Sequence, residues 1–257
     1  MQSNFQKVIE FNKQFGIKIF SEPQFNIFDD EPKLVAYRMS LIREEISELE
    51  EGVKTNDVIE IIDALADILY VVYGMGVSVG FNIDNAYLYA SGDSNFMKTI
   101  NYHKSKGINI PQKVNTFVLT LYSSFFDHSM QQLRNAMQSL EHSVKNKEYK
   151  LMTESLINLV FSAYTLGYII GINVDEAYDI VHKSNMSKLC NDDRSAQDTV
   201  VWYLKNGPKD ANGDMLYKTP AYRKSYDDKY YVVYDVEKSK ILKSIYYTET
   251  DFSKILI

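Results

Sequence analysis

The sequence predicts an all-α fold: a helical bundle built from two tandem copies of one unit, with a small β-hairpin appendage at the C-terminal end. Three observations lead to this prediction. Similar residues recur at an offset of 91 residues, as from Gly80 to Gly171. Apolar residues within each copy follow the helical period, whereas the end of the chain alternates between polar and apolar residues as a strand does.

The repeat includes both apolar positions and turn positions, and a fixed repeat period is the signature of a duplicated structural unit. Identical residues coincide at Arg43 and Arg134, Leu49 and Leu140, Val53 and Val144, Lys54 and Lys145, Leu65 and Leu156, Tyr73 and Tyr164, Gly76 and Gly167, Asn82 and Asn173, Asp84 and Asp175, Ala86 and Ala177, and Tyr87 and Tyr178. We therefore expect a pseudo-twofold bundle in which each copy covers the apolar face of the other.

Each copy is predicted to contain two long helices and a shorter third helix. In the first copy, the first helix spans residues 34–52, and Asp57 caps a second helix that runs to about Gly80. Asp84 is expected to cap the third helix, since aspartate is a favoured N-cap residue. Short turns between the helices predict antiparallel packing.

The composition of the chain excludes some classes of function. The chain has 257 residues and a formal net charge of −6, and an acidic protein lacks the basic surface that broad nucleic-acid binding requires. A small anionic substrate remains compatible, because a bound metal reverses the local charge. With a single cysteine, Cys190, no intrachain disulfide can form, which fits a reducing, cytoplasmic environment. The first residues lack the basic start and apolar run of a secretion signal, so secretion is not expected.

One apolar stretch requires comparison with a membrane span. Residues 156–174 carry no charge and are nearly long enough to cross a bilayer. The stretch contains Asn158, Ser162 and Thr165, and no basic cluster flanks it. A buried core helix is therefore favoured, and no membrane partner is expected.

Two stripes of carboxylates stand out in the first copy. Glu44, Glu45 and Glu48 share one face of the first helix, and Asp63 and Asp67 are four residues apart on the second. Antiparallel helices would bring the two stripes together, where the carboxylates would resist ionising at the same time. A hard divalent cation relieves this repulsion, and oxygen ligands suit Mg²⁺. We predict Mg²⁺ as the cofactor, with Mn²⁺ as the alternative.

The competing interpretation is a pair of solvated acidic helix faces. It is preferred for Glu50 and Glu51, and it stays open for Glu60. It is weak for Asp63 and Asp67, whose neighbours in IIDALADILYVV must be buried, because buried charges require a partner. A salt bridge is the structural alternative, but no basic residue occurs between positions 54 and 98.

The second copy has lost most of these acids. The residues that correspond to Glu44, Glu45, Glu48, Asp63 and Asp67 are Asn135, Ala136, Ser139, Glu154 and Asn158. This pattern indicates a fused dimer that has retained one chemical site.

The combined motif resembles the MazG-like all-α nucleoside triphosphate pyrophosphohydrolases, nearest to their phosphoribosyl-ATP pyrophosphohydrolase-like branch. The resemblance rests on EExxE, on DALADILYVVYG, on the GFNID turn and on SNxxK, and it covers about residues 5–100 and, degraded, 115–190. It implies that Glu45, Glu48 and Asp67 bind magnesium, with Glu44 beside them. A carboxylate at the edge of such a cage can accept a proton from a metal-bound water, and we expect Glu44 to be this catalytic base. Many relatives have Glu where this chain has Ala64, and Asp63 is expected to substitute for it as a ligand.

The resemblance also implies substrate-binding residues. Asn95 and Lys98 match the Asn and Lys that approach the substrate phosphates in the family, and Asn185 and Lys188 match them in the second copy. Asn12 matches a segment that lines the nucleotide pocket. For the lysines, an ordinary surface charge is the alternative.

We therefore expect three regions: residues 1–110 as the copy with the acidic site, 111–190 as the degenerate copy, and 191–257 as a small α+β extension with a turn near residues 237–239. The expected activity is release of a nucleoside monophosphate and pyrophosphate from a nucleoside triphosphate. A noncatalytic nucleotide-binding or assembly protein on the same scaffold is the alternative. Single-copy relatives form dimers or tetramers, so a homodimer is expected. The sequence does not identify the base.

Overall fold

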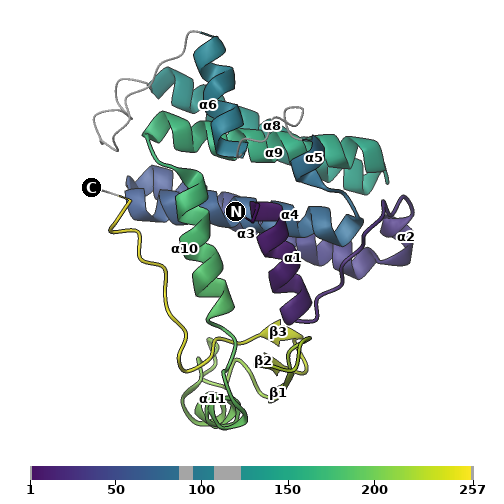
Figure 1. Ribbon diagram of the computed structural model, residues 1–257, viewed down its shortest axis with the longest axis vertical. Helices are drawn as coiled ribbons and strands as arrows, with labels where there is room; N and C mark the ends of the chain where they lie inside the picture. Colours follow the sequence, from purple (N-terminus) through teal and green to yellow (C-terminus); the bar gives the residue numbers. More distant parts are fainter. Residues whose placement is uncertain (1, 87–94, 107–122, 256–257) are drawn as a thin grey trace. The chain divides into compact units, whose positions relative to one another are not determined.

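The computed structural model describes residues 2–86, 95–106 and 123–255 (Figure 1). The chain forms two compact units. The first comprises residues 1–9, 19–181 and 251–257, and the second comprises residues 10–18 and 182–250. Helices dominate the described residues, and the strands form one small antiparallel sheet near the C-terminal end. The predicted all-α class with a small β appendage is confirmed.

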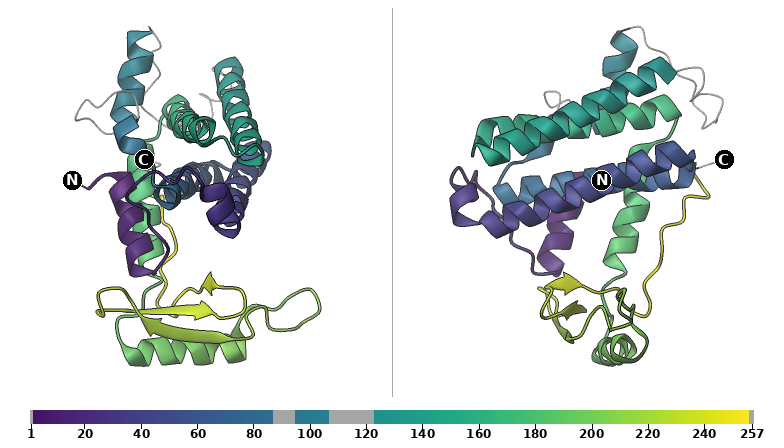
Figure 2. Two further views of the ribbon diagram at one scale, coloured as in Figure 1. Left: turned by 90° about the vertical axis from the view of Figure 1, so that its right-hand side faces the viewer. Right: turned by 180° about the vertical axis from the view of Figure 1, so that it is seen from behind.

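Two helix pairs make up most of the first unit. The helices are α2 (Ile27–Asp30), α3 (Pro32–Thr55), α4 (Val58–Val79), α5 (Ile83–Ala86), α6 (Asn95–Ser105), α8 (Ser123–Lys145) and α9 (Tyr149–Ile170). Helices α3 and α4 pack together, as do α8 and α9, and the two pairs meet where α4 contacts α9 (Figure 2). Helices α1 (Asn4–Gln14) and α10 (Val174–Met186) contribute residues to both units.

Local signals explain where the first pair begins and ends. Helix α3 ends at Asn56, whose φ of 56° is left-handed, and the Asp57 side chain then accepts hydrogen bonds from the N–H groups of Ile59 and Glu60 at 3.0 and 3.1 Å. This is the N-cap predicted for α4. Gly80 ends α4 with a φ of 70°, a conformation that glycine adopts without steric cost.

The third helix of the first copy differs from the prediction. Asp84 lies inside the first turn of α5, and the side chain of Asn82 caps the turn by accepting a hydrogen bond from the N–H of Asn85 at 3.3 Å. The expectation that Asp84 caps this helix is therefore wrong. Asn and Asp are equally good caps, so the sequence offered two candidates two residues apart.

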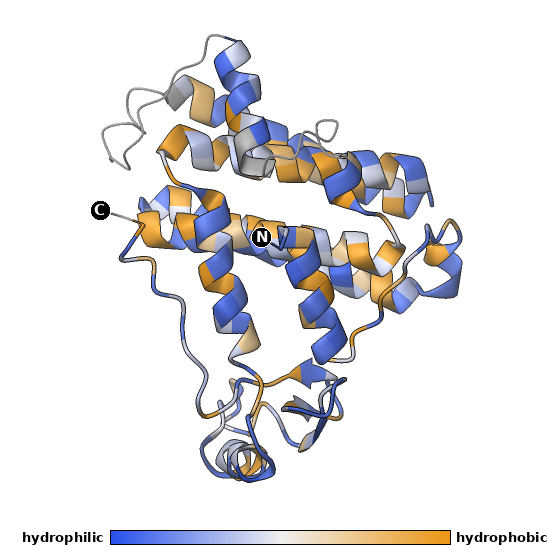
Figure 3. Ribbon diagram, viewed as in Figure 1, coloured by the Kyte–Doolittle hydropathy of each residue, from blue (hydrophilic) through white to orange (hydrophobic). Residues whose placement is uncertain are grey.

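Helices α4 and α9 form the core of the first unit, and apolar residues gather along them (Figure 3). Between Ile61 and Val79, every residue of α4 is buried except Asp63 and Asp67. Most of α9 is buried in the same way, which confirms that residues 156–170 are a core helix. No single helix in the described parts of the chain is long and apolar enough to cross a membrane. Helices α9 and α10 pass this test only as a pair, bent by 112°.

The second unit carries the β appendage. Its elements are α11 (Asp193–Asn206), β1 (Pro220–Lys224), β2 (Tyr231–Asp235) and β3 (Lys240–Ile241), and the strand order is β1-β2-β3. The predicted hairpin is present as β2 and β3, in which Tyr234 pairs with Ile241. Strand β1 adds a third strand that the sequence interpretation missed. Cys190 is buried in the small core beneath the sheet.

Candidate active site

The carboxylates of α3 and α4 converge in the first unit. Burial, together with repulsion from Asp67, Glu48, Glu44 and Asp63, raises the pKa of Glu45 to about 9. Since a charge shifts a neighbouring pKa only when the two lie close together, the carboxylates predicted to form one cluster are near one another.

Glu48 marks the solvent side of this acidic cluster. The residue is largely exposed, and its pKa is raised by partial burial of the carboxylate and by repulsion from Glu44 and Glu60, while a hydrogen bond with Glu45 opposes the increase. Glu60 thus lies at the edge of the cluster. Glu50, for which a solvated role was preferred, is exposed and pairs with an arginine of α8.

The donor chemistry of the cluster fits a hard divalent cation. All the donors are carboxylate oxygens, the ligands that Mg²⁺ prefers, and the raised pKa of Glu45 reports repulsion that a cation would relieve. Within residues 2–86, 95–106 and 123–255, however, no three His, Cys, Asp or Glu side chains are arranged as a coordination group.

Helix α10 brings aromatic side chains beside the cluster. The Tyr178 ring stacks on Tyr70 of α4, with centroids 5.3 Å apart and planes inclined by 26°. Burial raises the pKa of Tyr178 well above its usual value, with repulsion from Tyr70, Tyr73, Asp84 and Asp67 adding to the shift. Tyr178 therefore lies close enough to Asp67 to sense its charge.

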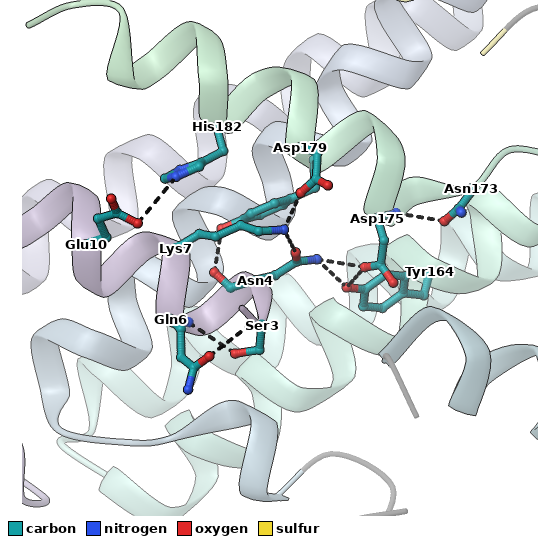
Figure 4. Close-up of polar contacts among 11 residues, drawn as sticks. Ser3, Asn4, Gln6, Lys7, Glu10, Tyr164, Asn173, Asp175, Asp179 and His182 are labelled. Carbon is teal, nitrogen blue, oxygen red and sulfur yellow. Dashed lines mark hydrogen bonds and ion pairs between the residues drawn. The ribbon is translucent and has the colours of Figure 1, made fainter. Parts of the chain in front are cut away.

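A polar network connects α1 to α9 and α10 within the first unit (Figure 4). The Asn4 amide donates to the Tyr164 hydroxyl at 3.0 Å and to Asp175 at 2.7 Å, and Tyr164 donates to Asp175 at 2.8 Å. Lys7 forms an ion pair with Asp179 and donates to the Asn4 side chain at 3.1 Å. Sequence reasoning did not single out this network, because its members are far apart in the chain.

Arg38 of α3 is a second feature that the sequence interpretation missed. Only 6% of the residue is exposed. Its Nε donates to the Ser78 hydroxyl at 2.8 Å, and its Nη2 is buried without a hydrogen-bond partner among the described residues. Arg38 lies seven residues before Glu45, so both occupy the same helix face. The available signal was a cation within the apolar stripe that includes Val35 and Ile42.

The predicted substrate-binding residues are distributed over both units. Lys98 is half-buried in α6, and Asn95 begins this helix, although its side chain lies outside the described residues. Asn12, Asn185 and Lys188 belong to the second unit, where Lys188 donates to Asn185 at 2.5 Å. Both polar atoms of the Asn12 side chain are buried with no hydrogen-bond partner in the part of the chain that is described.

Four of the five corresponding positions of the second helix pair carry neutral residues, and the fifth carries a glutamate. Ala136 is buried, Ser139 accepts a hydrogen bond from Ser155 at 2.9 Å, Asn135 accepts one from Gln131 at 2.9 Å, and Asn158 is exposed. Glu154, the one acid, is exposed and lies 3.8 Å from Lys150.

Comparison with known proteins places this architecture in a family. The family described as phosphoribosyl-ATP pyrophosphohydrolase matches residues 8–88, a range that includes the whole acidic cluster. Uncharacterized protein L479 of Acanthamoeba polyphaga mimivirus is 35% identical over 254 residues, which cover 99% of this chain and 96% of that protein. No solved structure matches the chain. Residues 8–88 thus belong to the phosphoribosyl-ATP pyrophosphohydrolase family, and the chain as a whole belongs to one family with protein L479.

Proposed function

We propose that the protein is a magnesium-dependent (deoxy)nucleoside triphosphate pyrophosphohydrolase that releases a nucleoside monophosphate and pyrophosphate. The observation that supports this most strongly is the convergence of Glu45 with four other carboxylates in a half-buried site, where its pKa rises to about 9. A protein gains no stability from such a cluster unless a cation occupies it, because the charges repel and are costly to bury.

Glu45, Glu48 and Asp67 are the proposed ligands, and Asp63 is the neighbouring carboxylate that completes the set. A bound Mg²⁺, or Mn²⁺ as the alternative, would neutralise phosphate charge and lower the pKa of a bound water. Asp63 and Asp67 come from an otherwise buried stretch of α4, so the helix fixes their positions.

Glu44 is the proposed general base. It is exposed, unlike its neighbour Glu45, and it lies close enough to Glu45 to raise the pKa of that carboxyl. A carboxylate at the edge of the cluster, where water has access, can accept a proton from an attacking water. Its direct neighbour in the sequence points deeper into the protein and serves as the ligand.

Five further residues are proposed to bind substrate: Asn12, Asn95, Lys98, Asn185 and Lys188. Asn12 has support from its surroundings, because a buried amide without hydrogen bonds costs stability that a ligand can restore. The lysines would stabilise the pyrophosphate leaving group. Arg38 is a further candidate for an anionic group of the substrate, since its buried Nη2 also lacks a partner in the described chain.

The three-region organisation and the duplication, with boundaries at residues 110 and 190, are part of this proposal. Two ion pairs support it: Arg43 Nε lies 2.7 Å from Glu141, and Arg134 Nε lies 2.7 Å from Glu50. The 91-residue offset converts each pair into the other. Likewise Tyr73 and Tyr164, related by the same offset, meet through their hydroxyl groups at 3.4 Å. Such reciprocal contacts are typical of a twofold interface.

One metal-dependent site per chain follows from the duplication, because the neutral groups of the second helix pair do not form a carboxylate cage. Because one chain already contains two copies of the unit, association with one further chain would give four copies in total. We therefore propose that the protein is a homodimer. Light scattering that shows a strict monomer at micromolar concentration would contradict this part of the proposal.

The decisive experiment is a panel of nucleoside triphosphates, incubated with and without Mg²⁺, with products identified by phosphorus NMR. Monophosphate and pyrophosphate should appear together from the first turnover, and only when the metal is present. Accumulation of diphosphate and orthophosphate would overturn the proposed bond cleavage. Nucleotide binding without any turnover across the panel would favour the noncatalytic alternative.

A further inference from the structure

A cavity of about 280 Å³ lies between α6, α8 and α9 of the first unit. Aromatic side chains form much of its wall. Tyr102 meets Phe161 edge to face, with centroids 5.5 Å apart, and Phe125 meets the ring of His103 edge to face at 6.0 Å. Aromatic side chains in such a wall can stack on a flat ligand.

The polar groups of the cavity suit the edge of a heteroaromatic ring. His103 is 4% exposed, and its Nε2 lies 3.0 Å from the Thr165 hydroxyl. Its Nδ1 is buried and has no hydrogen-bond partner within the described residues. Burial lowers the pKa of His103, so the ring is neutral at pH 7 and its nitrogens can donate or accept. A buried polar atom without a partner costs free energy that a ligand can recover.

The charge of the cavity is opposite to that of the acidic cluster. None of the described side chains that line it is a carboxylate, and Lys106 contributes a cation that also lies 5.8 Å from the centroid of the Tyr102 ring. The cavity therefore favours a neutral or anionic ligand over a metal ion or a polyamine. Its volume is near the lower end of about 300–1,000 Å³ that is usual for small-molecule sites, which suits one ring system and a pentose.

The first helix pair shows why this space exists. Arg38 and Gly74 of the first pair correspond to Ser129 and Thr165 of the second, at the 91-residue offset. In the first pair the Arg38 guanidinium packs against Gly74, where its Nη1 would be 2.8 Å from an added Cβ. In the second pair a serine stands in place of the arginine, and Ser129 lines the cavity. The loss of the long side chain opens the space that His103 borders.

We infer that this cavity is a second, noncatalytic nucleotide site, which binds the base of a nucleoside monophosphate against the aromatic wall formed by Tyr102, Phe125 and Phe161, and its phosphate at Lys106. Bases of every kind can stack on aromatic side chains, and polar groups at the ring edge add orientation. The site needs no metal, and it lies on the helix pair that has lost the carboxylates.

The test uses the full chain in the presence of EDTA, titrated calorimetrically with AMP, GMP, CMP and UMP, and separately with adenosine and inorganic phosphate. At least one monophosphate should bind once per chain, more tightly than phosphate alone. Ser129→Leu fills the cavity and should weaken this binding by about tenfold or more. Ser129→Ala leaves the space open and should bind as the natural protein does.

Further variants distinguish the cavity from the acidic cluster. Phe161→Ala should weaken binding even if Ser129→Leu fails to fold, and circular dichroism checks the folding of each variant. Lys106→Gln should weaken binding of the monophosphate and not of adenosine, whereas Lys104→Gln, two residues earlier near the end of α6, should change neither. Glu45→Gln should leave this binding unchanged.

Three results would overturn the inference. The first is that no monophosphate binds in EDTA. The second is that folded Ser129→Leu and Phe161→Ala proteins bind as tightly as the natural chain, and the third is that Glu45→Gln abolishes binding. These results are independent of turnover, so failure of the proposed hydrolase activity would leave this test intact.

Discussion

The two helix pairs of the first unit share a scaffold and differ in chemistry. Helices α3 and α4 have 24 and 22 residues, and α8 and α9 have 23 and 22. Gly80 and Gly171 end α4 and α9 in the same left-handed conformation. Yet the first pair holds five carboxylates, and the second has serine, alanine and asparagine at four of these positions and glutamate at the fifth. The scaffold therefore forms without the acidic cluster, so folding does not explain why the cluster is present.

The pairs also differ at one buried arginine. Arg38 fills its region of the first pair at the cost of an unpartnered Nη2 among the described atoms. Ser129, at the corresponding place, borders a cavity. The same helical scaffold therefore carries a cation and carboxylates in its first helix pair and borders an aromatic cavity in its second.

Substitutions of the acids in the first helix pair should produce the largest effect, a loss of catalytic rate that substitutions in the second helix pair do not cause. Glu45→Gln, Glu48→Gln or Asp67→Asn should each lower kcat/KM by roughly a thousandfold, which corresponds to about 4 kcal/mol of transition-state stabilisation. The amides keep the shape of the side chain and remove the charge that binds the cation. Initial rates with a saturating metal concentration would measure this effect.

The matched control lies in the second pair. Glu154 corresponds to Asp63 by the offset and is exposed, so Glu154→Gln should retain the normal rate. If all three amide variants keep near-normal rates, the acidic cluster is not the catalytic site. If Glu154→Gln is as inactive as they are, the two pairs are not chemically distinct.

An effect of intermediate size is expected in the pH dependence of the free energy of unfolding, and it comes from Glu45 of the first helix pair. The raised pKa of Glu45 means that the metal-free folded protein holds a proton that the unfolded chain releases above about pH 4.5. The free energy of unfolding should therefore fall as the pH rises toward 9, by at most about 1.4 kcal/mol per pH unit. Partial exposure of the site makes the real slope smaller.

Measurements between pH 7 and pH 9 isolate this effect. His103 has a lowered pKa, so its opposite contribution, which destabilises the protein as the pH falls, is confined to pH values below about 6.5. Urea unfolding in EDTA should show a decline over this range in the natural protein and a flatter profile in Glu45→Gln. A natural protein that is equally stable at both pH values would indicate that the carboxylates do not repel one another as the geometry implies.

Much of this arrangement follows from the sequence. The helical period located α4 and α9, and the spacing of Asp63 and Asp67 within a buried stretch identified the two residues that the structure leaves partly exposed there. Arg38 was missed because a single cation in an apolar stripe resembles a surface residue when the neighbouring helix is not known. The cavity was missed for a related reason: its walls come from three helices, and a missing side chain at Ser129 leaves no mark in a local pattern. Roles that depend on a bound ligand, as for Asn12 and Lys98, stay predictions.

The smallest expected effect concerns the two ion pairs that join the first helix pair to the second. The ion pairs Arg43–Glu141 and Arg134–Glu50 are about half exposed, with side-chain accessibilities of 43–53%. Exposed ion pairs contribute about 0–1 kcal/mol each, since solvent screens them and two long side chains must be ordered. A double-mutant cycle with alanine at both partners of each pair should therefore give two small coupling energies.

These two coupling energies should also be equal within error if the pairs are related by a pseudo-twofold axis, because the same groups then meet in the same surroundings. Both should decrease together as salt rises from 0.05 to about 0.5 M, since the screening length shortens for each pair alike. Chemical unfolding of the natural protein and six variants, three to a cycle, would measure this. A coupling near 1 kcal/mol in one cycle and none in the other would show that the interface is asymmetric, and the 91-residue offset would then describe the sequence without describing the packing.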